Sequence, residues 1–276
     1  MTDTGAGATA TPDPTAAATA GPSPAAVAAE RIRLVAESTG HLLHTVTALD
    51  PAAVAEPSAL PGWSRGHVLA HLARNADSLV NLLDGARTGR DIPQYATPET
   101  RDRDIEAGAP RPLDVQLADL RDASHRFAEA AAELDDEAWE SEVRHRTGYV
   151  LGAADIPWKR LVETEYHHVD LDAGYTPAHW PQEFAVAEFR RLAARLDGAA
   201  GLPAVLLIAD DTTDRARIGA PGADPAGAPG LTVEGPVRAL TAWLGGRSDG
   251  DGLQVHRDGV QLTDGRAALP GLPALG

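Results

Sequence analysis

Two side chains with metal-binding chemistry lie four residues apart in the sequence, Glu163 and His167. In a helix, residues four apart leave the same face about one turn apart, which is the arrangement that helical metal sites use. One carboxylate and one imidazole do not complete a site, so a third ligand must come from another segment, and His71 is the natural candidate. Glu165 and His168 leave the same helix about 100° away from these neighbours, and we expect them on the surface or between helices.

Other histidines compete with His71 for the third position. His67 lies one turn before it, and His41 and His44 lie in the first apolar-periodic segment, so any of the three can point toward the pair. His67 can also act beside the ion by orienting the substrate or a ligand. The pattern has a purely structural interpretation as well, because such a Glu/His pair is more often solvated than ligating and a single helical histidine is more often a hydrogen-bonded core residue.

A set of two histidines and one glutamate leaves one coordination position open. That open position is typical of catalytic rather than structural zinc sites, although imidazole and carboxylate also accept other divalent ions. The chain has no cysteine, which excludes disulfides, thiolate ligands and a cysteine nucleophile. Any thiol chemistry must therefore use a low-molecular-weight thiol supplied from outside the chain.

The charge balance excludes one class of partner. The 276 residues include 40 acidic and 24 basic side chains, and the formal net charge of −16 opposes nucleic-acid binding, which depends on clustered Lys and Arg. No segment is long and apolar enough to span a bilayer, and residues 1–25 lack the basic start and apolar core of a secretion signal. We therefore expect a cytoplasmic protein with neither a membrane nor a nucleic-acid partner, present as a monomer or a weak homodimer.

Helices must position these candidate ligands, and residues 26–180 are predicted to supply them as a helical bundle. Ser23-Pro24 and Ser64 are expected to cap the first two helices. Residues 1–25 are small, polar and Pro-rich and are predicted to be a disordered tail. Apolar residues recur at helical spacing in four long segments, with a short helix between the second and third; the segments are about 24–50, 64–89 (fading from Gly85 to Gly89), 113–134 and 155–174.

Residues 181–276 are predicted to form a smaller domain of mixed α and β structure, which makes the fold class α+β. The Gly- and Pro-rich segment 219–230 is predicted to be a loop. Period-two alternation at 253–262 around Asp258-Gly259 predicts a hairpin. The other expected elements are, in order, a helix at 182–196, strands at 204–208 and 231–233, and a helix from Gly235-Pro236 to Gly245-Gly246.

Two stretches of the sequence resemble a known family. The run LPGWSRGHVLAHLARNAD at 60–77, and the stretch 158–171 with its core EYHHVDL, are similar to the DinB-like family, specifically to mycothiol-dependent maleylpyruvate isomerases. The similarity covers most of residues 26–247. It implies an N-terminal DinB-like four-helix bundle that binds zinc through a histidine on the second helix and a Glu/His pair on the fourth, which correspond to His71, Glu163 and His167.

The resemblance also implies a small C-terminal domain that helps to close the site, with an arginine that holds an acidic substrate. Arg247 corresponds to that arginine, and at the end of its helix it can equally bond the last carbonyl groups. The implied reaction converts maleylpyruvate to fumarylpyruvate with mycothiol as thiol cosubstrate. The thiolate adds to the carbon–carbon double bond, the resulting single bond rotates, and elimination gives the trans product. Arg247 and His67 are the residues we expect to assist the metal.

Three other functions use the same features. A mycothiol S-transferase or thiol-exchange enzyme needs the same three ligands but acts on another electrophile, such as a natural-product intermediate, and its product is a stable thioether. An iron-dependent sulfoxide synthase of the ergothioneine type carries His-x-x-x-His-x-Glu, which His67 and His71 fit, but Ala73 replaces the acid. In a non-catalytic bundle that binds a metabolite or partner, the histidines are packed core groups.

Overall fold

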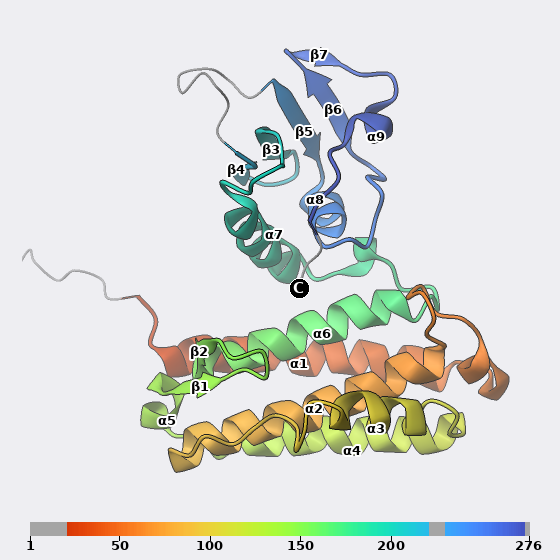
Figure 1. Ribbon diagram of the computed structural model, residues 1–276, viewed down its shortest axis with the longest axis vertical. Helices are drawn as coiled ribbons and strands as arrows, with labels where there is room; N and C mark the ends of the chain where they lie inside the picture. The colour runs from red at the N-terminus through yellow and green to blue at the C-terminus, as the bar shows by residue number, and fades with distance from the viewer. Residues whose placement is uncertain (1–20, 221–229, 274–276) are drawn as a thin grey trace, which may run out of the picture.

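A computed structural model of the protein describes residues 21–220 and 230–273, which form a helical part and a smaller part built on a sheet (Figure 1). The predicted α+β fold class is confirmed. Most of the predicted N-terminal tail and of the predicted loop 219–230 lies outside the described residues. Within the described residues, no helix is long and apolar enough to cross a membrane.

Four long helices make up the helical part, as predicted. Ser23 and Ser64 begin the first two, because each side-chain oxygen accepts a backbone N–H of the first turn. Gly89 ends the second at a φ of 65°, a conformation that glycine adopts without strain. The fourth helix ends a few residues earlier than predicted. The four are α1 (Pro24–Thr47), α2 (Arg65–Thr88), α4 (Leu113–Ala132) and α6 (Ile156–Asp170).

Short elements connect these helices. The short helix expected between the second and third is α3 (Thr100–Gly108). A hairpin of two three-residue strands was not predicted, because Val143 and Leu151 are its only buried residues and leave no clear alternation in the sequence. The remaining connecting elements are η1 (Pro51–Ala55), α5 (Asp136–Glu140), β1 (Glu142–Arg144), β2 (Val150–Gly152), η2 (Ala153–Asp155) and η3 (Pro177–His179).

Helix α2 lies at the centre of this part, in contact with α3, α4 and α6. Its apolar residues Leu69, Leu72 and Leu79 are buried in a core shared with α1, α4 and α6. Glycine permits the close approach of α3, since a Cβ at Gly66 would lie 2.2 Å from the carbonyl oxygen of Ala109. The N-terminal half of α2, which carries His71, is thereby covered on one side by α3.

The C-terminal part packs two helices against a five-stranded sheet of order β4-β3-β5-β6-β7, in which only β3 and β5 run parallel (Figure 1). Its elements are α7 (Gln182–Leu196), β3 (Val205–Ala209), β4 (Arg215–Ile218), β5 (Leu231–Gly235), α8 (Val237–Leu244), β6 (Gln254–Arg257), β7 (Val260–Gln261) and α9 (Gly265–Ala268). The predicted hairpin is present, and Asp258 and Gly259 both have positive φ. The edge strand β4 was not predicted, because Ile218 is its only buried residue.

Polar and aromatic contacts fasten this second part to α6. The indole of the fully buried Trp180 donates to the carbonyl of Glu165 at 3.2 Å and stacks on Tyr166. The Tyr166 hydroxyl donates to Glu188 on α7 at 3.0 Å. Phe184, which follows the predicted boundary at residues 180 and 181, also packs in the core of the helical part. The helix that carries Glu163 and His167 is therefore held from both sides.

Candidate metal centre

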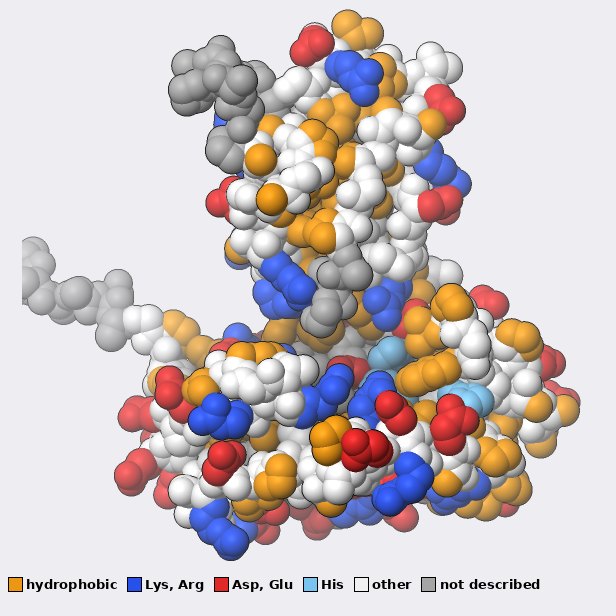
Figure 2. Space-filling model, viewed as in Figure 1, with side chains coloured by type: hydrophobic (Ala, Val, Ile, Leu, Met, Phe, Trp, Pro, Cys, Tyr) orange, Lys and Arg blue, Asp and Glu red, His pale blue; other side chains and the backbone are white. Residues whose placement is uncertain are grey.

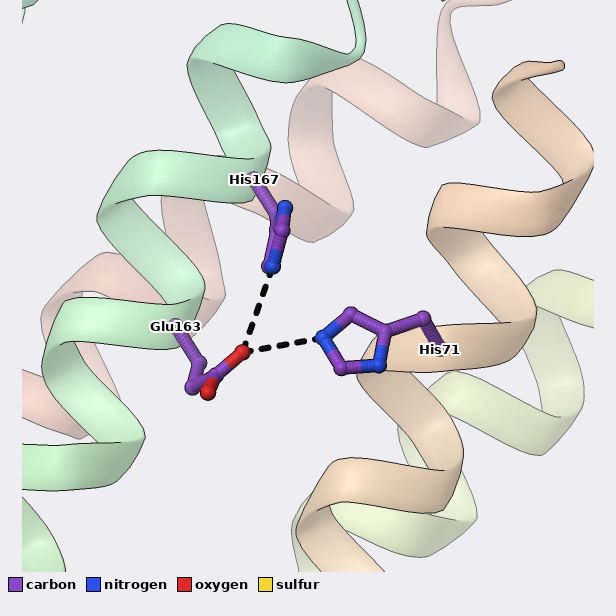
Figure 3. A group of neighbouring side chains, drawn as sticks. All are labelled: His71, Glu163 and His167. Atoms are coloured by element: carbon purple, nitrogen blue, oxygen red, sulfur yellow. Dashed lines mark hydrogen bonds and ion pairs between the residues drawn. The ribbon is translucent and has the colours of Figure 1, made fainter. Parts of the chain in front are cut away.

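His71 from α2 and Glu163 and His167 from α6 point toward one another (Figure 3). One carboxylate oxygen, Oε2 of Glu163, lies 2.9 Å from Nε2 of His71 and 3.2 Å from Nε2 of His167. The two imidazole rings are nearly perpendicular, with centres 4.6 Å apart. One donor atom from each residue lies within 4.8 Å of the other two, so the three side chains can contact a single ion.

The protonation of these groups suits a cation. Burial lowers the pKa of His71 to about 4, which keeps its ring neutral at physiological pH. Burial opposes ionisation of Glu163, but hydrogen bonds with His167 and His71 outweigh it and hold the pKa of Glu163 well below its ordinary value. The site therefore combines a carboxylate anion with an imidazole that has a free nitrogen lone pair.

A buried carboxylate that the sequence reasoning missed, Asp170, orients His167. Its Oδ2 lies 2.8 Å from Nδ1 of His167, so the opposite ring nitrogen faces Glu163. This is the partner that metal-bound histidines usually have, and it fixes both the tautomer and the orientation of the ring. Burial works against a high pKa for His167, but its hydrogen bonds with Asp170 and Glu163 outweigh this and raise the pKa. The three-residue spacing from His167 to Asp170 was the available signal.

A family model for the mycothiol maleylpyruvate isomerase N-terminal domain matches residues 35–172, half of the chain, and the matched range contains all three converging residues. The chain belongs to the mycothiol-dependent maleylpyruvate isomerase family. It is also similar to a crystal structure of the mycothiol-dependent maleylpyruvate isomerase, with 28% identity and a TM-score of 0.75, over 83% of this chain and 92% of that one. A histidine-to-alanine mutant of that isomerase has a TM-score of 0.74, with the same identity and coverage. No curated protein matches the chain.

In this member of the isomerase family, Arg247 reaches from the end of α8 to Asp170. Its Nε and Nη2 donate to the two carboxylate oxygens of Asp170 at 3.2 and 2.7 Å, and Nη1 donates to the carbonyl of Gly245 at 3.0 Å. The guanidinium also lies over the ring of Tyr166, 4.5 Å from its centre. Arg247 thus acts on the site through Asp170 and His167 and also bonds the helix end, while a direct contact with substrate stays a prediction.

His67 does not join the three converging residues. Its Nδ1 accepts the backbone N–H of Ser64 at 3.1 Å at the start of α2, and its ring stacks on Trp63. The other ring nitrogen lies 3.5 Å from a carboxylate oxygen of Glu106. His67 therefore caps the helix that carries His71, and its assistance to the reaction stays a prediction.

The remaining histidine candidates lie elsewhere. His41 and His44 are exposed on α1 and do not share in the cluster. His168 is buried, bonds the Thr45 hydroxyl at 2.8 Å and stacks on Tyr175. Glu165, which is also fully buried, accepts a hydrogen bond from the Tyr175 hydroxyl at 2.7 Å. Glu165 and His168 were expected either on the surface or between helices, and the structure places them between helices.

A buried arginine ties α6 to α2 beside the converging residues. Arg160 is inaccessible to solvent, and its Nη1 donates to the carbonyl of Leu72 at 2.8 Å and to Oδ1 of Asn75 at 2.9 Å. Leu72 directly follows His71, and Arg160 lies three residues before Glu163 on the same face of α6. These two hydrogen bonds fix the separation of the helices at the level of the site.

Proposed function

We propose that the protein is a thiol-dependent cis–trans isomerase that converts maleylpyruvate to fumarylpyruvate, with mycothiol as cosubstrate. The observation that carries the proposal is the convergence of His71, Glu163 and His167 from two helices, in a chain that belongs to this isomerase family. The chain has no cysteine, so the thiol must be a second, small-molecule substrate.

The donor set fits a divalent cation. Two imidazole nitrogens and one carboxylate oxygen are the protein ligands of catalytic zinc sites that keep one position open, and zinc is the ion that we propose. A bound dication lowers the pKa of a thiol that coordinates it and so supplies a thiolate at neutral pH. His71, Glu163 and His167 are the residues that hold the ion in this proposal.

The side chains of this protein prepare the site for that chemistry. Asp170 accepts the Nδ1 proton of His167, so Nε2 faces the site and can bind the ion once it has given up its own proton. Glu163 is ionised because of its low pKa, and His71 is neutral. The ring of Trp63 lies with its centre 5.6 Å from that of His71 and covers that side of the site.

The proposed reaction conserves all atoms of the substrate. The thiolate sulfur forms a bond to one carbon of the cis double bond, and the electron pair of that bond moves through the conjugated carbonyl to its oxygen. The remaining single bond rotates. Return of the electron pair then forms the trans double bond and breaks the carbon–sulfur bond, whose electron pair leaves with the sulfur and regenerates the thiolate. A cation near the enolate oxygen lowers the barrier because negative charge develops there.

The test is turnover of maleylpyruvate by zinc-loaded protein with and without mycothiol, followed by absorbance and mass spectrometry. We expect fumarylpyruvate only in the presence of the thiol, and loss of both bound zinc and turnover in His71→Ala and Glu163→Gln. Turnover that survives in a metal-free variant contradicts the role of the site. A stable thioether in place of the isomer identifies a thiol S-transferase instead.

A further inference from the structure

The only lysine in the chain, Lys159, lies on the same face of α6 as the converging residues. Lys159, Glu163 and His167 follow one another at intervals of four, so they form a line along the helix with about one turn between neighbours. The Lys159 ammonium lies 5.0 Å from the centre of the Tyr149 ring. Among the described residues, no carboxylate pairs with it, so its charge is available to a ligand.

A second cation comes from the β1–β2 turn. The backbone N–H of Arg146 donates to the side chain of Gln94 at 2.8 Å, and Gln94 in turn donates to Ser78 on α2 at 3.3 Å. These bonds hold the turn against the bundle. His145, the neighbour of Arg146, stacks on Tyr149 with ring centres 4.5 Å apart, and the Lys159 ammonium lies 5.0 Å from the centre of the same Tyr149 ring, so Lys159 lies beside the turn that carries Arg146. In the part of the chain that the structure describes, no carboxylate pairs with Arg146.

A third cation contacts the site itself. Nη2 of Arg101 on α3 lies 3.5 Å from Nδ1 of His71. The carboxylate that pairs with Arg101 is that of the neighbouring Asp102, which is exposed and bonds the other terminal nitrogen. The edge of the Arg101 guanidinium that carries Nη2 therefore faces the site. Within residues 21–220 and 230–273, no carboxylate pairs with this edge.

These three side chains stand out in an acidic protein. With 40 acidic and 24 basic residues, carboxylates are abundant, and Arg247 beside the site has its own in Asp170. Figure 2 shows Lys and Arg side chains bordering the hollow between the two parts of the molecule, with a histidine visible at its edge. Cations that have no carboxylate partner near a site raise the local concentration of anions and bind them by charge-assisted hydrogen bonds.

We propose that Lys159, Arg146 and Arg101 bind a carboxylate group of the acidic substrate and so place its double bond beside the thiol at the metal centre. Lys159 is the principal contact, and Arg146 and Arg101 supply further positive charge. Four helical residues rise about 6 Å, which suits an acid whose carboxylate lies a few bonds from the reacting carbon. The identity of this acid rests on the proposed function, whereas carboxylate binding does not.

Steady-state kinetics of Lys159→Met and Arg146→Gln test the proposal. Methionine keeps the apolar stem of Lys159 and removes only the charge. We expect a KM for maleylpyruvate about tenfold higher, with kcat within about twofold and an unchanged KM for mycothiol. Lys159→Arg should restore most of the affinity. Arg195→Gln, an exposed change on α7 with the same loss of charge, is the control and should match the wild type.

Binding of maleate, measured by calorimetry, separates this inference from the proposed isomerase activity. If the wild type binds maleate and Lys159→Met binds it about tenfold more weakly, the carboxylate site stands even where no isomerisation is detected. Unchanged maleate binding and unchanged KM in both variants overturn the proposal. A rise in the KM for mycothiol alone also overturns it, because the cations then serve the thiol.

Discussion

At the scale of single residues, the geometry of the proposed metal centre depends on the proposed ligands and also on the side chains that contact them. His167 is held by Asp170, and Asp170 by Arg247, so one ligand is oriented through two successive contacts. Among the described residues, no carboxylate orients the His71 ring in this way, and its Nδ1 faces the Arg101 guanidinium instead. The two imidazoles are therefore not equivalent, and substitutions around them should have different effects.

Replacement of Asp170 by Asn should weaken metal binding without removing a ligand. Loss of the carboxylate that accepts the His167 Nδ1 proton is expected to lower zinc affinity by about 10- to 100-fold. Competition titration against a zinc chelator measures the change. Asp172→Asn is the matched control, since Asp172 is exposed two residues further on. Equal affinities of Asp170→Asn and the wild type would exclude an orienting role for Asp170.

His145 should make the folded state less stable in acid. Its pKa is lowered to about 4, below the ordinary value near 6.5, so below pH 6.5 the unfolded chain binds a proton that the folded protein does not. Protonation of His145 in the unfolded chain therefore lowers the free energy of unfolding as the pH falls from about 6.5 to about 4. Above pH 6.5, His145 changes the free energy of unfolding little. Melting temperatures across this range should fall less steeply for His145→Gln, whereas the exposed control His125→Gln should keep the wild-type slope. Identical slopes for all three proteins would contradict the lowered pKa.

At the scale of elements, the site consists of two helices held at a fixed separation. Arg160 provides two hydrogen bonds between α6 and α2 at this level. Arg160→Met should lower the free energy of unfolding by about 2 kcal/mol, because the carbonyl of Leu72 and the amide of Asn75 lose their charged donor. Zinc affinity should fall as well, because the separation of His71 from Glu163 is no longer fixed.

Denaturant unfolding and zinc competition on the same samples check this prediction. Arg160→Lys keeps one charged donor. Its free energy of unfolding and its zinc affinity should both lie between those of the wild type and of Arg160→Met. A variant that is destabilised by this amount but binds zinc as tightly as the wild type would show that Arg160 only stabilises the fold.

The helices were predictable because their signals are local. Ser23, Ser64 and Gly89 mark helix ends by their own hydrogen bonding or backbone conformation, and apolar spacing marks the faces. The spacing of Glu163 and His167 likewise depends on one helix alone. The strands β1, β2 and β4 gave weak patterns because each has a single buried side chain, and their position depends on contacts made by the whole fold.

The contacts that join residues of different helices at the site could not be predicted from local signals. His71 was one of four histidine candidates by spacing, and resemblance to the family selected it. The bonds of Arg247 to Asp170, of Arg160 to Leu72 and of Arg101 to His71 join residues up to 88 positions apart, so nothing in the local sequence shows them. Such pairs are known only once α2, α3, α6 and α8 are placed together.

At the scale of the whole molecule, the sheet-containing part acts on the bundle through α6. Arg247 bonds Asp170, Tyr166 bonds Glu188, and the indole of Trp180 bonds the backbone of Glu165. Asp170 in this junction also contacts His167, so the proposed metal centre lies next to it. The three cations proposed to bind carboxylate would give this strongly acidic protein a locally basic site, which suits an acidic substrate and a thiolate.

The most direct test of the central claim is the zinc X-ray absorption spectrum of the loaded protein before and after addition of mycothiol. We expect zinc to have nitrogen and oxygen ligands and to gain one sulfur ligand at about 2.3 Å when the thiol is added. We expect no such site in Glu163→Gln protein. A spectrum that stays free of sulfur at saturating mycothiol, or zinc bound equally well without Glu163, would contradict that claim.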